Sequence, residues 1–211
     1  MIDELRIQWI FNLEEMGSHP NKMGEWFDYL VQEYTSEPRK YHGLGHIHHM
    51  LELAEKIKSK VEDWDSFYFA IWFHDVIQDK LLATEMLSAE KCCMAMLELG
   101  LDKSAADRAA RLILATKSHD QDYSGDVKLF VDLDLSILGA PRKEYSAYAN
   151  QCRQEFNIPN WLYRKGRIEL LRKFLNKKRI YKSDCFWEEL EANARSNISY
   201  EMEILRNGGL L

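Results

Sequence analysis

The chain contains the run Phe67-Tyr68-Phe69-Ala70-Ile71-Trp72-Phe73, which is followed directly by His74 and Asp75. It is the longest uninterrupted apolar stretch in the sequence, and it is far too short to span a bilayer. A stretch this apolar belongs in the interior of a folded protein. Burying the imidazole and the carboxylate that follow it is costly unless they pair with each other or bind a cation. The run therefore predicts an interior element that brings two titratable groups to one place.

Around this run, the apolar residues recur at helical spacing almost throughout the chain. No Asn-Gly hairpin signal separates alternating strands, and no internal repeat is present. We therefore expect an all-α fold in a single domain covering residues 1–211. Helices are predicted at residues 5–16, 23–34, 50–61, 85–99, 104–116, 145–156 and 162–175, with a long C-terminal helix that ends before residue 208. Loops are predicted at residues 35–45, 78–84 and 117–127.

The composition excludes several classes of protein. Only 10 glycines and 4 prolines occur in 211 residues, which disfavours a turn-rich sandwich or barrel. Since 46% of the residues are hydrophobic, the chain can form a sizeable core without disulfides or structural metals. The 28 basic and 34 acidic residues give a net charge of −6, so neither a nucleic acid polymer nor an anionic membrane is an obvious partner.

The cysteines and the N-terminus indicate a cytoplasmic protein. Cysteines occur at positions 92, 93, 152 and 185 without a Cys-x-x-Cys pair, which is typical of core residues in a reducing compartment. Asp3 and Glu4 stand where a secretory signal would carry basic and then apolar residues. The apolar stripes of the N-terminal helices can pack internally or form the face of a homodimer, and the sequence leaves both open.

Histidines are concentrated just upstream of the apolar run. Six of the seven lie between positions 42 and 119, and four of these fall within residues 41–49. Gly43 and Gly45 predict a loop that enters a helix, so His46 lies near the helix start and faces the core, whereas His48 lies farther round. A loop-held imidazole that faces the interior is a candidate metal ligand. The alternative is a hydrogen-bonded histidine at a helix cap.

The pair His74-Asp75 is the second candidate group. Asp79 lies four residues after Asp75 and shares its face if the helix continues. Two carboxylates beside a histidine suit metal binding together with proton transfer. The alternative is a His–Asp ion pair that caps the helix end.

The third candidate is a carboxylate in the segment 130–138. On a helix, the neighbours of Asp134 three and four positions away are all apolar, whereas Asp132 borders Lys128 and Ser136. We therefore expect Asp134 to point inward, and a capping role suits Asp132 better. Together with the two histidines and Asp75, Asp134 forms a mixed nitrogen and oxygen set that suits Mn, Mg, Fe, Co, Ni or Zn.

The order His46, His74-Asp75, Asp134 resembles the signature of the HD-domain metal-dependent phosphohydrolases. The strings around these residues, Tyr41-His42-x-Leu44-x-His46-Ile47 and Asp134-Leu-Ser-Ile-Leu-Gly139, are similar to those of a bacterial branch of that superfamily. The resemblance extends from about residue 41 to about residue 203. It continues through residues 115–119, Gly166-Arg167 and the stretch 191–197.

This resemblance implies an HD-type helical domain, with a metal-site core at about residues 41–140 and C-terminal helices at about 141–207 packed on it. It places metal ligands at His46, His74, Asp75 and Asp134, and it leaves Asp75 and Asp79 as the catalytic carboxylates. The guanosine tetraphosphate hydrolases of the superfamily carry Glu-Asp where this chain has Gln78-Asp79, which argues against that substrate.

The expected activity is hydrolysis of a phosphomonoester or pyrophosphate, of a nucleotide above all, by water that a divalent metal ion activates. Candidate substrate-binding residues are His42, His49, Lys80, His119 and Arg153. Arg167 and Arg195 lie with Arg153 in the C-terminal helices, where phosphate contacts and helix-packing ion pairs are both open. Two other readings compete: a di-iron oxygenase of the HD type, and a non-catalytic module that binds a metal and senses a nucleotide.

Overall fold

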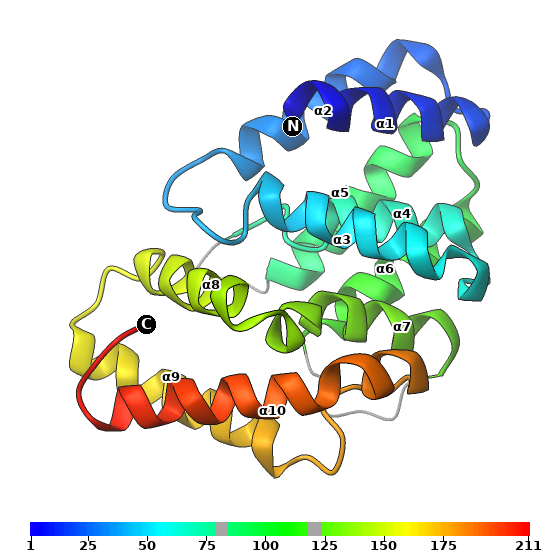
Figure 1. Cartoon of the computed structure of the whole chain (residues 1–211). Coiled ribbons are helices and arrows are strands. Elements are labelled where there is room, and N and C mark those ends of the chain that lie inside the picture. The colour runs from blue at the N-terminus through cyan, green and yellow to red at the C-terminus, as the bar shows by residue number, and fades with distance from the viewer. Residues whose placement is uncertain (79–83, 118–123) are drawn as a thin grey trace. The chain divides into compact units, whose positions relative to one another are not determined.

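The computed structural model describes residues 1–78, 84–117 and 124–211 of the chain, and these ranges contain helices and no strand (Figure 1). The predicted all-α fold is thus confirmed for the part that is described. Within it, no helix is both long enough and apolar enough to cross a membrane. The helices are α1 (Ile2–Glu15), α2 (Pro20–Tyr34), α3 (Leu44–Ile57), α4 (Trp64–Phe73), α5 (Thr84–Glu98), α6 (Lys103–Ala115), α7 (Gly125–Asp134), α8 (Arg142–Gln154), α9 (Asn160–Asn176) and α10 (Asp184–Arg206), with short 3-10 helices at Lys58–Lys60 (η1) and Leu135–Gly139 (η2).

The chain divides into two compact units, and one boundary between them in the sequence falls within α7. The first comprises Met1–Ser36 and His42–Val131, and the second comprises Glu37–Tyr41 and Asp132–Leu211. From the sequence, the boundary between the metal-site core and the C-terminal helices was expected near residue 140, several residues after the observed boundary between Val131 and Asp132. The interpretation of residues 1–211 as one domain stays a prediction.

Helix α4 is the centre of the first unit. Every residue from Ser66 to Phe73 is buried, and the helix packs against α3, α5 and α6. The ring of Trp9, from α1, lies 5.6 Å from that of Phe69 and 5.3 Å from that of Trp72, both in edge-to-face arrangements. A helix that is apolar on all sides must be surrounded by other elements. The predicted burial of the run at residues 67–73 is confirmed.

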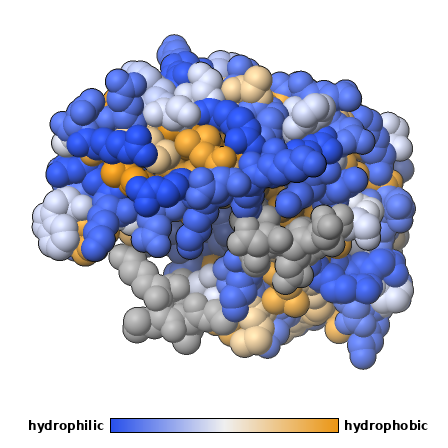
Figure 2. Space-filling view, turned by 90° about the horizontal axis from the view of Figure 1, so that it is seen from below, coloured by the Kyte–Doolittle hydropathy of each residue, from blue (hydrophilic) through white to orange (hydrophobic). Residues whose placement is uncertain are grey.

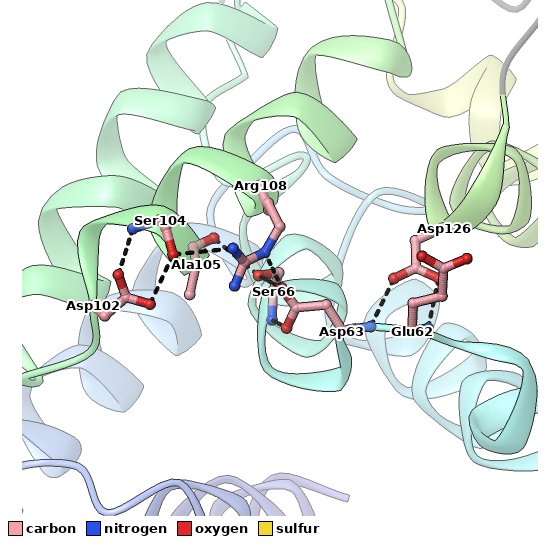
Figure 3. Close-up of polar contacts among 8 residues, drawn as sticks. All are labelled: Glu62, Asp63, Ser66, Asp102, Ser104, Ala105, Arg108 and Asp126. Atoms are coloured by element: carbon pink, nitrogen blue, oxygen red, sulfur yellow. Dashed lines mark hydrogen bonds and ion pairs between the residues drawn. The ribbon is translucent and has the colours of Figure 1, made fainter.

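A polar network fixes the N-terminus of α4 (Figure 3). The carboxylate of Asp63, the N-cap residue, accepts hydrogen bonds from the backbone N–H and the hydroxyl of Ser66 and forms an ion pair with Arg108 of α6. Asp126, in the first turn of α7, accepts the backbone N–H groups of Glu62 and Asp63 at 2.8 Å each. Two neighbouring helices therefore hold the start of α4 in place.

The link between α5 and α6 depends on a glycine. Gly100 has φ +87°, a conformation that side-chain-bearing residues rarely adopt, and it follows α5 as the sequence predicted. A Cβ at this position would lie 2.6 to 2.9 Å from atoms of the His19 imidazole. Both the backbone angle and the close approach of His19 therefore require glycine here.

In the second unit, α9 and α10 run side by side, and α10 also packs against η2 (Figure 1). The buried Arg167 of α9 forms a two-pronged ion pair with Glu201 of α10, at 2.8 and 3.1 Å. Glu191 accepts the backbone N–H groups of Ile180 and Tyr181. Buried carboxylates that receive several donors thus hold these helices and the segment between them.

The four cysteines are free thiols, as the sequence predicted. Cys92 and Cys152 are buried, and burial raises the pKa of the Cys152 thiol to about 12. Such thiols are not reactive nucleophiles at neutral pH. They act as small apolar core residues.

Figure 2 shows one face that is mostly hydrophilic, on which small hydrophobic areas are separated by polar residues. On α1, Ile7 and Phe11 are 70% and 61% exposed. Scattered apolar residues of this kind do not by themselves mark an interface. The homodimer considered from the sequence stays a prediction.

We predict that Asp63→Ala lowers the free energy of unfolding by about 1–2 kcal/mol at neutral pH, because α4 loses its cap. Burial alone would raise the pKa of the Asp63 carboxyl, but hydrogen bonds from Ser66 and the ion pair with Arg108 hold it below its usual range. A lowered pKa stabilises the fold above the unfolded value of about 3.9, and this contribution is lost as the pH falls through the lower folded value. Urea unfolding at pH 7 and pH 3 should therefore show a smaller difference between wild type and variant in acid.

The control is Asp107→Ala, which removes an exposed carboxylate from α6. We expect this change to leave the unfolding free energy nearly unaltered at both pH values. Equal losses in the two variants would contradict the capping role of Asp63.

Candidate metal centre

Three side chains of the first unit converge on one point. His46, His74 and Asp75 each offer one ligand atom, and these three atoms lie within 4.8 Å of one another. The two imidazole Nε2 atoms are 3.2 Å apart, and His74 Nε2 lies 3.3 Å from Asp75 Oδ2. Both histidines are buried, with exposed fractions of 4% and 2%. The sequence predicted all three as ligands, and the structure brings them together.

His46 is delivered by the first turn of α3. The helix begins after Gly43, whose carbonyl accepts the His46 N–H at 3.0 Å. Ile47 and Met50 of the same helix are completely buried, so this side of α3 faces the core. The expected inward direction of His46 is therefore confirmed, and His48 lies on a more exposed side, 3.7 Å from Glu52.

His74 and Asp75 follow the last residue of α4. The N–H of His74 donates to the Ala70 carbonyl at 2.9 Å, so the helical hydrogen-bond pattern continues as far as His74. Its ring Nδ1 lies 3.0 Å from the Ile71 carbonyl oxygen. Because a carbonyl only accepts hydrogen bonds, Nδ1 must carry the proton in this contact, and the neutral ring then has its lone pair on Nε2.

The alternative of a His–Asp ion pair that caps the helix end stays open, because His74 Nε2 lies 3.3 Å from Asp75 Oδ2 and Nδ1 contacts the Ile71 carbonyl. Nδ1 caps the end of α4, and this contact sets the direction of the ring. Nε2 faces His46 and Asp75 with a lone pair available for a cation. Histidine ligands of metal ions generally have their other ring nitrogen bound in this way.

Two of the three distances between the donor atoms fit a shared cation. Two donors that bind one ion at about 2.1 Å lie about 3.0–3.4 Å apart in octahedral or tetrahedral geometry. The separations of 3.2 and 3.3 Å fall within that interval. The Asp75 side chain is 33% exposed, so the group is open to solvent on its carboxylate side. Two imidazoles and a carboxylate suit several divalent ions, Mn, Fe, Co, Ni and Zn among them.

The aspartates near the end of α7 are not arranged as expected. Asp132 is 0% exposed, whereas Asp134 is half-buried. The Asp132 carboxylate accepts the backbone N–H groups of Lys182 and Ser183 and the Ser183 hydroxyl, at 2.6 to 2.8 Å. The expectation that Asp134 is the more inward carboxylate was wrong, because neighbours on the same helix do not reveal a partner about 50 residues away in the sequence.

The N-capping role suggested for Asp132 was wrong: the residue lies inside α7, and its carboxylate holds Lys182 and Ser183 in the segment that precedes α10. Asp134, the last residue of α7, belongs to the second unit. Its role as a metal ligand stays a prediction.

The other candidates divide into two groups. The His42 ring is 6.2 Å from the His46 ring and is half-buried, as is His49 on α3. Asp79, Lys80 and His119 lie outside the described residues, and their predicted roles remain untested.

The arginines of the second unit make structural contacts. Arg153 donates to the carbonyls of Phe156 and Ile158 and to the side chain of Asn160, which closes the link between α8 and α9. Arg167 pairs with Glu201, and Arg195 pairs with Glu191. For all three, these contacts favour the helix-packing alternative over phosphate binding.

Two residues beside the centre were not identified from the sequence. The Phe130 ring lies 6.1 Å from the His74 ring, edge to face. The hydroxyl of Tyr34, at the end of α2, donates to the Trp72 carbonyl of α4 at 2.9 Å. Tyr34 could have been singled out from the sequence, because a tyrosine in the apolar stripe of a helix buries a hydroxyl that needs a hydrogen-bond partner.

Neither the family models nor the curated proteins compared with this chain gave a match. The resemblance to the HD superfamily therefore stays a prediction, and the centre is interpreted from its own residues.

We predict that His74→Ala and Asp75→Ala abolish stoichiometric metal binding, because each removes one of three converging donors. Elemental analysis after reconstitution with Mn²⁺ or Ni²⁺ should find the metal in the wild type and nearly none in either variant. The far-ultraviolet circular dichroism of the variants should stay helical. His48→Ala, which changes a more exposed histidine of α3, is the control and should keep its metal; full occupancy in His74→Ala and Asp75→Ala would exclude the centre.

Proposed function

We propose that the chain is a metal-dependent phosphohydrolase of the HD type, acting on a phosphomonoester or pyrophosphate, with a nucleotide as the first substrate class to test. The observation that carries this proposal is the convergence of the His46, His74 and Asp75 donor atoms within 4.8 Å. The sequence order of these residues, with Asp134 as the fourth ligand, supports the HD assignment. The net charge of −6 argues for a small-molecule substrate over a nucleic acid polymer.

Each residue of the proposed site has a separate role in the hydrolysis. A divalent ion bound there would acidify a water molecule and offset charge on a phosphoryl oxygen. His74 is held by the Ile71 carbonyl, so its Nε2 needs no reorientation to bind. Asp75 has the more exposed side chain, on the side from which water and substrate arrive, and it can accept a proton from water there. Asp79 remains the second proposed proton acceptor.

Asp134 is proposed as the fourth ligand on the order His46, His74-Asp75, Asp134 in the sequence, which resembles the HD signature. A carboxylate at this position would complete a set of two imidazoles and two carboxylates.

The di-iron oxygenase remains the second candidate, because the His42 ring lies 6.2 Å from the His46 ring and brings a third imidazole to this end of α3. Iron stoichiometry separates the two activities. Two iron ions with a visible charge-transfer band favour oxygenation, and one colourless divalent ion favours hydrolysis. A nucleotide-sensing module would instead show nucleotide-dependent thermal stabilisation without turnover.

We predict that the metal-reconstituted protein releases phosphate from at least one member of a panel of nucleotides and sugar phosphates. His74→Ala should lower that rate at least about 100-fold, because the loss of metal removes several kcal/mol of transition-state stabilisation. Removal of the metal with a chelator should abolish the rate, and addition of Mn²⁺ should restore it. No release from the whole panel with any of the candidate ions would contradict the proposed activity.

We also predict that Asp134→Asn lowers Mn²⁺ affinity at least about tenfold, as measured by titration calorimetry. The matched control is Asp132→Asn, which weakens the hydrogen bonds that hold Lys182 and Ser183 ahead of α10. This control should lower the melting temperature and leave the Mn²⁺ affinity of the folded protein unchanged. The opposite pattern would exclude Asp134 as a ligand.

A further inference from the structure

We propose that Tyr34, the last residue of α2, is a positioning residue that sets the spacing between the two segments that supply the metal ligands. This inference rests on the proposed metal centre at His46, His74 and Asp75. Tyr34 is 2% exposed and supplies no ligand itself. It contacts both ligand-bearing segments, one through its side chain and the other through its backbone.

The side chain holds the end of α4. The last carbonyls of a helix have no partner within the helix, and buried carbonyls need one. The Tyr34 hydroxyl donates to the Trp72 carbonyl at 2.9 Å, directly before the turn that carries His74. The other three carbonyls of this turn are satisfied locally: Ala70 by the His74 N–H, Ile71 by the His74 ring, and Phe73 by the Val76 N–H. Tyr34 is therefore the donor that ties this turn to another helix.

The backbone of Tyr34 meets the start of α3. A Cβ built on Gly43 would lie 3.0 Å from the Tyr34 carbonyl oxygen, so Gly43 and the end of α2 are in very close approach. Gly43 is the N-cap of α3, and its own carbonyl accepts the N–H of His46. The turn that carries His46 is thus built directly against α2.

The consequence is geometric. The two Nε2 atoms come from different helices and must stay about 3.0–3.4 Å apart to share an ion. Tyr34 lies against the segment of each, so a change in this residue alters the separation of the donors. The N-terminal helices would then be part of the metal site, although they contribute no ligand.

The test uses Co²⁺ alone as the probe, since its visible absorption reports coordination geometry directly. Tyr34→Phe removes only the hydroxyl. Gly43→Ala adds a methyl group against the Tyr34 carbonyl and displaces the start of α3. Both variants should bind Co²⁺ about tenfold more weakly than the wild type and show a changed absorption band, as expected when a group that orients a ligand is lost.

Each variant has a matched control. Tyr68→Phe removes another buried tyrosine hydroxyl, from α4 itself, which contacts the Gln8 carbonyl at 3.4 Å and the side chain of Trp72 but not the Trp72 carbonyl that Tyr34 binds. Gly45→Ala adds a methyl group in the same turn of α3, where nothing lies within 4 Å. Both controls should bind Co²⁺ with the affinity and spectrum of the wild type.

A second measurement separates positioning from general stability. Bound metal raises the melting temperature by an amount that grows with the logarithm of its affinity for the folded state. If Tyr34 only stabilised the fold, Tyr34→Phe would lower the melting temperature equally with and without Co²⁺. We expect the Co²⁺-induced increase itself to shrink in Tyr34→Phe and to be retained in Tyr68→Phe.

The outcomes distinguish this inference from the proposed function. Wild-type affinity, spectrum and Co²⁺-induced stabilisation in Tyr34→Phe and Gly43→Ala would overturn the positioning role and leave the metal centre intact. Failure of the wild type to bind Co²⁺ would overturn the centre itself, and the role of Tyr34 with it. Equal weakening in the experimental variants and their controls would also overturn the inference.

Discussion

The cost of burying polar groups at the end of an apolar helix governs this structure. Helix α4 is buried along its length from Ser66, so its terminal carbonyls and the imidazole that follows emerge in the interior of the first unit. Each of these groups needs a partner there. One ring nitrogen of His74 satisfies part of that need, and the other is left facing His46 and Asp75. The end of the helix and the candidate metal centre are therefore a single arrangement of hydrogen-bonding groups.

Both ends of α4 are fixed by neighbouring helices as well as by local capping contacts. At the start, Asp126 of α7 accepts the backbone N–H groups of Glu62 and Asp63, and Arg108 of α6 forms an ion pair with Asp63 (Figure 3). At the other end, Tyr34 of α2 binds the Trp72 carbonyl. A site whose ligands are held by rigid elements requires little rearrangement on binding.

Local sequence patterns predicted much of this fold. Apolar spacing placed most of the helices, and the dense run at residues 67–73 identified the most buried of them, because both depend on neighbours within a few residues. Helix α7 was not among the predicted helices, and its first residues fell in the loop predicted at residues 117–127. His46 could be assigned its direction for the same reason. Asp132 and Asp134 could not be ranked correctly, since the donors that make burial of Asp132 tolerable come from Lys182 and Ser183. Tyr34 was missed because its partner lies 38 residues away in the sequence.

The centre is asymmetric in its access to water. The side chain of Asp75 is one-third exposed, whereas both histidines are nearly inaccessible. A hydrated cation that entered from solvent would therefore encounter the carboxylate of Asp75 first and would lose water as it moved on to the imidazoles. Release would follow the reverse order, so the exchange of a bound ion would depend on the more exposed Asp75.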